Sequence, residues 1–224
     1  MDSDVTTVAV RSGATFERTW LDEGSWVDVA RNWLDGADQL YAALTERSPW
    51  QQGRVFRYER WVDEPRLSAA HSVRATGTTV PHPALLEAHR AIRDRYKVSF
   101  DGFSLAWYRD GRDLMAFHRD RDLRWLDDTV IALLVVGARR PFQIRPRANR
   151  YAHEAPDHGA THQFTPGQGD LLVMGGRTQV GWEHGVPRTD PTTPGRISVQ
   201  WRWTSRTGRP VVGASYGAPR HYSR

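Results

Sequence analysis

The chain has 224 residues, which is enough for one domain with a sizeable hydrophobic core and short for two independent ones. Its 31 basic residues exceed the 26 acidic ones, giving a net charge of +5, and all but Lys97 are arginine. Arginine suits recognition of phosphate or carboxylate, although GC-rich codon usage would produce the same composition. Cysteine is absent, which excludes disulfides, thiolate metal sites and cysteine nucleophiles, so a bound metal would need histidine and carboxylate ligands.

The chain shows no signal for secretion or membrane insertion. The first residues, MDSDVTTVAV, are acidic where a signal peptide is basic, and the longest apolar run, Val130 to Ala138, is too short to span a bilayer. We therefore expect a cytoplasmic monomer with no membrane partner. We expect residues 1–24 to be an N-terminal extension, 25–205 to form the domain, and 206–224 to be an irregular tail.

Two helices are predicted in the first half of the chain. In residues 37–48 the side chains of Leu40, Tyr41 and Leu44 share one helical face, and Asp35 precedes them as the expected N-cap. The second helix is predicted from about Pro83 to residue 96, with the proline in the first turn, where its missing N–H does no harm.

From residue 103 onward the sequence changes to short runs rich in Val, Ile, Trp and Phe, separated by Gly, Pro and Asp. The runs are FSLAWY (103–108), LMAFH (114–118), TVIALLVV (129–136), PFQIR (141–145), THQF (161–164), DLLVM (170–174), VGWEHGV (180–186) and RISVQWRW (196–203). Many short strands at this spacing predict an α+β, mainly β protein, with a sandwich or barrel and the helices packed outside. Residues 148–160 interrupt the pattern and predict an exposed insertion.

The stretch FHRDRD, residues 117–122, gathers charges of both signs after an apolar run. Alternate residues of a strand share a face, so His118 and Asp120 point the same way and could reach one ion. An H-x-D pair by itself is more often a surface pair or a strand-end turn. His184, beside a glycine after another strand, would add a third ligand, and two histidines with one carboxylate form the facial triad of non-haem iron(II) oxygenases.

The last predicted strand has one wholly polar face. Arg196, Ser198, Gln200 and Arg202 alternate with Ile197, Val199, Trp201 and Trp203. The polar face would lie in water in an ordinary antiparallel strand, or would line the interior of a barrel. Two arginines in an interior need anions, because burying an unpaired guanidinium costs several kcal/mol. A dicarboxylate co-substrate that chelates the metal would provide such an anion.

Three blocks of the chain resemble the AlkB family of iron(II)- and 2-oxoglutarate-dependent dioxygenases: WYRDGRDLMAFHRDRD (107–122), GDLLVMGGRTQVGWEHGVPRT (169–189) and GRISVQWRW (195–203). The likeness extends over about residues 25–205 and implies a double-stranded β-helix, or jelly-roll, core. It implies that His118, Asp120 and His184 bind Fe(II), that Arg196 and Tyr108 bind the distal carboxylate of 2-oxoglutarate, and that Arg202 lies nearer its metal-chelating end. Ala106 and Ser198 stand where the family usually has asparagine, and because both amides normally help to hold the co-substrate, the resemblance implies a lower affinity for it or a water in their place.

The resemblance also implies substrate contacts. Asp122 matches a position that contacts the exocyclic amino group of a damaged base, and PRLSAAH (65–71) is similar to the substrate-side loop, which supplies Arg66, Ser68 and His71. In that loop Ala70 and His71 replace an aromatic pair found in some relatives, so His71 would have to provide any stacking or hydrogen bond. The arginines of ARRPFQIRPRANR are candidates for phosphate contacts, or else form a solvated strand and loop edge: Arg139, Arg140, Arg145, Arg147 and Arg150.

The implied activity is oxidative demethylation of N-alkylated nucleobases of the 1-methyladenine or 3-methylcytosine type in DNA or RNA, with Fe(II), 2-oxoglutarate and O2. It releases formaldehyde, succinate and CO2 and would serve direct repair of alkylation damage. A nucleic acid is the expected partner, with the base single-stranded or flipped from the duplex. Two alternatives stay open: a 2-oxoglutarate-dependent hydroxylase or demethylase of a protein, lipid or small molecule, and a nucleic-acid-binding protein without catalysis.

Overall fold

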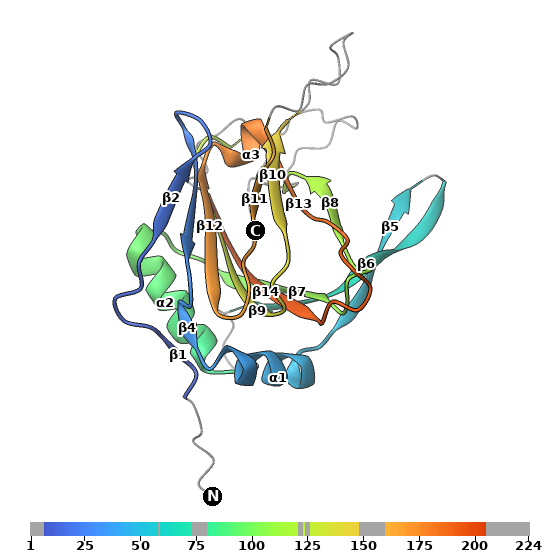
Figure 1. The fold of residues 1–224 in the computed structure, drawn as a ribbon, viewed down its shortest axis with the longest axis horizontal. Helices are drawn as coiled ribbons and strands as arrows, with labels where there is room; N and C mark the ends of the chain where they lie inside the picture. The colour runs from blue at the N-terminus through green and yellow to red at the C-terminus, as the bar shows by residue number, and fades with distance from the viewer. Residues whose placement is uncertain are drawn as a thin grey trace, which may run out of the picture.

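The computed structural model describes residues 7–57, 59–72, 80–120, 123, 126–147 and 160–204. Two antiparallel sheets dominate the fold (Figure 1). The large sheet has, in spatial order, β2 (Glu17–Trp20), β3 (Ser25–Ala30), β12 (Asp170–Gly176), β9 (Thr129–Gly137), β14 (Arg196–Thr204), β7 (Gly102–Tyr108), β6 (Arg60–Ser72) and β5 (Gln51–Arg57). The small sheet has β11 (His162–Phe164), β10 (Phe142–Pro146), β13 (Trp182–Val186) and β8 (Met115–His118). This arrangement confirms the predicted α+β, mainly β fold with a jelly-roll core.

The centre of the large sheet, strands β9 and β12, is buried on both faces, which explains why β9 is a continuous apolar run. Alternation places Ala132 and Leu134 in the core beneath the helices, and Ile131 and Leu133 in a second core between the two sheets. The second core also contains Phe142 and Ile144 from β10 and Trp182 and Val186 from β13 in the small sheet. The two sheets therefore pack face to face and enclose the space in which the polar side chains of β14 lie.

The helices α1 (Ala37–Arg47) and α2 (Ala84–Tyr96) cover the other face of the large sheet, as predicted. Leu40 and Leu44 of α1 and Leu85 and Ile92 of α2 are buried in the helix-side core. The apolar residues of β14, including Trp201, belong to the same core. The polar face of β14 is consequently turned away from the helices and into the space between the sheets.

The N-cap predicted for α1 is wrong. Gly36 is the N-cap, with φ 65°, and this end of the helix has no side-chain cap hydrogen bond within the part of the chain that the structure describes. Asp35 lies instead in the short strand β4 (Leu34–Asp35), which pairs with β1 (Ala9–Val10), and its carboxylate forms an ion pair with Arg11. The positive φ favours glycine here because it is the one residue without a Cβ.

The sequence pattern missed the strands before residue 103. In the expected N-terminal extension, β1 pairs with β4, and β2 pairs with β3 at the edge of the large sheet. The segment PRLSAAH, expected as a loop, belongs to the 13-residue strand β6, which pairs with β5 and β7. Its charged and small residues hide the alternation that marks a strand.

The hairpin formed by β5 and β6, drawn in cyan, extends away from the body of the molecule (Figure 1). Phe56 and Trp61 lie opposite each other near its tip, with their ring centroids 5.6 Å apart, and are 60% and 59% exposed. No helix in the described part of the chain is long and apolar enough to cross a membrane. The predicted insertion at 148–160, apart from residue 160, and the predicted tail lie outside the described residues.

Candidate metal centre

Pairing of β8 with β13 brings the two predicted histidine ligands together. His118 and His184 are direct partners in this antiparallel ladder, and their ring centroids lie 4.3 Å apart. Asp120 follows β8, and one of its oxygens lies 3.4 Å from Nε2 of His118. Ligand atoms of all three residues lie within 4.8 Å of one another. The structure therefore assembles the triad that sequence reasoning could only propose from residues 66 positions apart.

The surroundings of His184 and Asp120 favour the forms of these side chains that can bind a cation. Burial, followed by the nearby His118, lowers the pKa of His184 to about 3, so its imidazole is neutral at ordinary pH. Burial alone would raise the pKa of Asp120, but Arg202 and the hydrogen bond with His118 hold it well below its usual value. Nδ1 of His118 lies 3.0 Å from the carbonyl oxygen of Ala116, which leaves Nε2 free to face the cluster. Two histidine nitrogens and one carboxylate fit the donor set of Fe(II).

Asp120 is fixed from two sides. Nε of Arg202 donates to Oδ2 of Asp120 at 2.6 Å, and the backbone N–H of Asp120 donates to Oε1 of Gln179 at 2.9 Å. Gln179 is buried in the short helix α3 (Thr178–Gly181), immediately before the strand that carries His184. The Gln179 side chain therefore connects the segment that carries Asp120 to the segment that carries His184. Sequence reasoning missed Gln179, because no local pattern distinguishes it from any other buried amide.

Arg196 lies on the polar face of β14, at the opposite end from Arg202, and fits a carboxylate. It is fully buried beside its cross-strand partner Tyr108, and its Nη2 donates to Oγ of Ser198 at 3.2 Å. Its Nε and Nη1 are buried and have no hydrogen-bond partner among the described residues. Burial lowers the pKa of Arg196 to about 10, so the guanidinium is still charged at neutral pH. A buried cation with unsatisfied donors calls for an anionic ligand, as expected of the distal carboxylate of 2-oxoglutarate.

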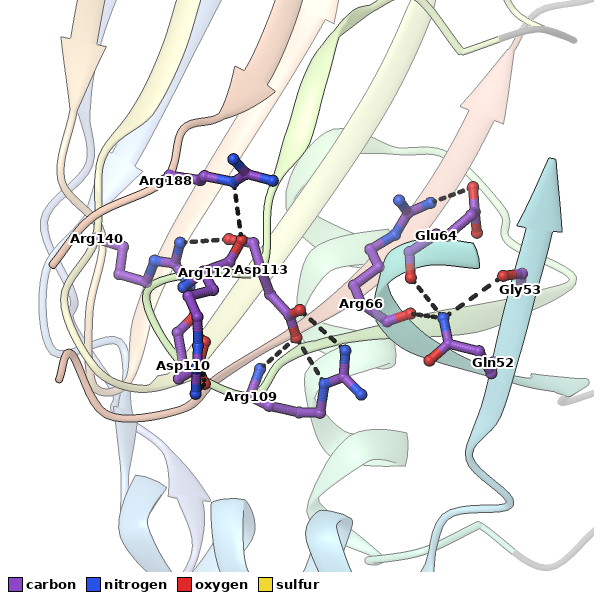
Figure 2. A network of polar contacts seen from close by, with 10 residues as sticks. All are labelled: Gln52, Gly53, Glu64, Arg66, Arg109, Asp110, Arg112, Asp113, Arg140 and Arg188. Carbon is purple, nitrogen blue, oxygen red and sulfur yellow. Dashed lines mark hydrogen bonds and ion pairs between the residues drawn. The ribbon is translucent and has the colours of Figure 1, made fainter. Parts of the chain in front are cut away.

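Arg140, expected to face phosphate, is a buried structural residue, so that prediction is wrong. Its guanidinium is fully buried and donates to the carbonyl oxygens of Asp110, Asp113 and Pro187 at 2.7, 2.8 and 3.0 Å. Figure 2 shows this loop, where Arg188 also donates to the carbonyl oxygen of Arg112. Arg140 thereby ties the segment after Tyr108 to the end of β13.

Arg139 and Arg145 of that cluster are paired with different carboxylates. Arg139 pairs with the buried carboxylate of Asp170 at 3.2 Å. Arg145 pairs with Glu183 at 3.2 Å, and its guanidinium carbon lies 3.9 Å from the ring centroid of Phe117. Arg147 is exposed after β10, and Arg150 lies outside the described residues. Phosphate contacts by Arg145 and Arg147 remain a prediction, and the ion pair with Glu183 weakens the case for Arg145.

The substrate-side residues separate by face of the sheet. Ser68 lies beside Ala106, which is in turn paired with Ser198, so these three share the face of the metal centre. Arg66 is on this face too and pairs with Glu64 at 3.3 Å (Figure 2). His71 is paired with Phe103 and stacks on it at 5.2 Å, in the helix-side layer. It also lines a cavity together with Arg202, so its contact to a base stays a prediction. Asp122 lies outside the described residues.

Comparison with known proteins agrees with this site. Residues 30–209 match the family model described as the 2OG-Fe(II) oxygenase superfamily. The chain is 28% identical over 195 residues to "Alpha-ketoglutarate-dependent dioxygenase alkB homolog 3" of Mus musculus, a match covering 84% of this chain and 66% of that protein. It is 24% identical over 198 residues to "DNA oxidative demethylase ALKBH2" of Bos taurus, covering 81% and 71%.

A solved structure shares the fold. "The structure of OsALKBH1" superposes with a TM-score of 0.52 at 17% identity, covering 83% of this chain and 99% of that one. The chain spans slightly less than two thirds of the mouse relative. The matched model covers most of the chain, including the triad and Arg196. The chain therefore belongs to the 2OG-Fe(II) oxygenase superfamily, and its curated relatives support its place in the AlkB family.

Proposed function

We propose that this chain is an Fe(II)- and 2-oxoglutarate-dependent dioxygenase that removes methyl groups from ring nitrogens of nucleobases in DNA or RNA, as direct repair of alkylation damage. The observation that carries the proposal is the pairing of a His-Asp-His cluster, in which His118 is half-buried and His184 buried, with a buried arginine on the same face of the β-sandwich. The arginine, Arg196, has two nitrogens without partners. The His-Asp-His cluster fits the metal, and Arg196 fits the carboxylate of the co-substrate.

The side chains of the site divide the work of binding and orientation. His118, Asp120 and His184 would hold the iron, while Arg196, with Ser198 and Tyr108 beside it, would bind the distal carboxylate of 2-oxoglutarate. Arg202 and Gln179 keep the Asp120 carboxylate in place. Apolar residues between the sheets, including Leu133 and Phe142, exclude water from this space.

The iron, with 2-oxoglutarate and O2, supplies the oxidation of a C–H bond. One oxygen atom enters succinate, formed with loss of CO2, and the other converts the N-methyl group to N-hydroxymethyl. That group then breaks its bond to the ring nitrogen and leaves as formaldehyde, with its hydroxyl proton transferred to the nitrogen. The protein's part is to hold the methyl group at the metal.

A nucleic acid is the substrate that several features support. The bovine relative is named a DNA demethylase, the chain carries a net charge of +5, and two aromatic rings are exposed on the protruding hairpin. Exposed aromatic rings offer stacking surfaces for unpaired bases, and a base inside a duplex would have to be flipped to reach the metal. We further propose that the protein acts as a cytoplasmic monomer.

The test is mass spectrometry of a single-stranded oligonucleotide with one 3-methylcytosine, incubated with the protein, iron(II), 2-oxoglutarate and air. We expect loss of one CH2 mass with the wild type and none with His118→Ala. Succinate formation without any change in alkylated oligonucleotides would retain the chemistry and refute the nucleic-acid substrate. Failure of both reactions in a folded, iron-loaded sample would refute catalysis.

A further inference from the structure

A cavity of about 350 Å³ opens where β6, β7 and β14 end beside the metal centre. Ala70, Ser104 and Gln200 lie next to one another across these three strands, on the face that also carries Arg202. All four residues line the cavity. Because Ala70 and Ser104 are small, the space in front of the Gln200 and Arg202 side chains stays open. Since Arg202 also holds Asp120, the cavity adjoins the metal centre.

The guanidinium of Arg202 occupies the hydrogen-bond acceptors of the neighbouring side chains, and these side chains form the wall of the cavity next to Asp120. It donates to Oδ2 of Asp120 at 2.6 Å, to Oγ of Ser104 at 2.7 Å and to Oε1 of Gln200 at 2.5 Å. A guanidinium has donors and no acceptor, so the amide of Gln200 must turn its oxygen toward Arg202. The NH2 group of Gln200 is then what this side chain has left to offer, and among the described residues it has no partner. The wall next to the metal ligand therefore presents N–H and O–H donors to whatever occupies the cavity.

The substrate bases differ in the atom beside the methylated nitrogen. In 3-methylcytosine that nitrogen lies between a carbonyl carbon and the carbon bearing the amino group, and in 3-methylthymine it lies between two carbonyl carbons. In 1-methyladenine a C–H group stands where 3-methylcytosine has the carbonyl. With the methyl group held at the metal, a wall of donors would bind the carbonyl oxygen and would meet a C–H group in adenine, which leaves the donors unpaired.

We propose that Gln200 is a specificity-determining residue that selects bases with a carbonyl group next to the alkylated nitrogen, and so favours 3-methylcytosine and 3-methylthymine over 1-methyladenine. This rests on the proposed function, because it assumes that the methyl group is presented to the metal of this site. One well-placed hydrogen bond changes recognition by roughly tenfold.

The experiment compares kcat/KM for two single-stranded oligonucleotides that differ only in carrying 3-methylcytosine or 1-methyladenine. We expect the wild type to favour 3-methylcytosine by roughly tenfold. Gln200→Met keeps the length of the side chain and removes the donor, so it should lower kcat/KM for 3-methylcytosine to about the level for 1-methyladenine, which should itself change little. Gln200→Glu keeps an acceptor for Arg202 but places an oxygen where the NH2 group was, and should produce the same selective loss if the methionine variant does not fold.

A matched control is Gln143→Met, which removes an amide on β10 that bonds Gln163 away from the cavity and should leave both rates unchanged. Dissociation constants of both oligonucleotides for the metal-free protein, from fluorescence anisotropy, should show the same selective loss in the Gln200 variants. Equal repair of both adducts by the wild type, or an equal loss on both in the variants, would overturn the role of Gln200 and leave the demethylase proposal standing. Repair of neither adduct by iron-loaded wild type would overturn both.

Discussion

Two fully buried arginines should respond in opposite ways to the same substitution. In the protein without co-substrate, Arg196 keeps Nε and Nη1 unpaired, and its pKa, lowered from 12.5 to about 10, corresponds to about 3 kcal/mol by which the fold disfavours the charged group. Arg196→Met removes that cost and nearly conserves volume, so the free energy of unfolding should rise by about 1–3 kcal/mol. The same substitution removes the partner of the 2-oxoglutarate carboxylate and should raise its dissociation constant about 30-fold or more.

Arg140 provides the contrast, because its guanidinium satisfies three backbone carbonyl oxygens. Arg140→Met would leave those carbonyls without their donor, so we expect a loss of about 3–5 kcal/mol in the free energy of unfolding. Urea denaturation of both variants without ligands measures the two changes. Calorimetric titration of 2-oxoglutarate, with manganese(II) in place of iron, measures the affinity.

Saturating 2-oxoglutarate should stabilise the wild type and have almost no effect on the Arg196 variant. If Arg196→Met destabilises the protein as much as Arg140→Met does, the inference that Arg196 is an unpaired cation awaiting an anion is wrong. If 2-oxoglutarate binds the Arg196 variant with unchanged affinity, the assignment of the carboxylate site is wrong, whatever the stability shows.

Three further predictions follow from particular contacts. Gln179→Leu should weaken cobalt(II) binding about 10-fold or more and alter the visible spectrum of the bound ion. Gln179→Glu keeps the acceptor for the Asp120 N–H and should restore most of the affinity. Unchanged binding in the leucine variant would show that Gln179 does not position the ligand. Tyr96→Phe removes the 2.9 Å hydrogen bond to Asp28 between α2 and β3 and should cost about 1 kcal/mol in urea denaturation with no change in succinate formation, which a fall in turnover would contradict. Reversing Arg145 and Arg147 to glutamate should weaken oligonucleotide binding and flatten its salt dependence with iron binding intact. Arg47→Glu on α1 is the control, and an unchanged salt slope would remove both residues from the interface.

Local periodicity determined which residues could share a face. The alternation in β14 predicted one polar and one apolar face, and left open whether the polar face meets water or lines an interior. The structure places Arg196 and Arg202 in the interior, while Ile197, Val199 and Trp201 pack under the helices. The two-residue repeat of a strand predicted that His118 and Asp120 would lie together, but β8 ends at His118, and Gln179 and Arg202 hold Asp120 beyond the strand. These features survive in the sequence because burial forces polar and apolar residues to alternate along a strand that has a polar space on one side.

Tertiary structure decided which distant residues meet. His184 becomes a ligand candidate because β13 pairs with β8 in the register that sets it opposite His118, and no property of either segment alone fixes that register. The arginines at 139, 140 and 145 look alike in the sequence, yet one binds a buried carboxylate, one binds three carbonyls and one stacks on a ring. Likewise, the one-residue step between Ala70 and His71 puts the first on the metal face and the second in the helix layer. Chain composition alone determined that a metal here must take nitrogen and oxygen ligands. Side-chain contacts formed only on folding decided that Arg196 can bind an anion and that Arg140 stabilises the surrounding loops.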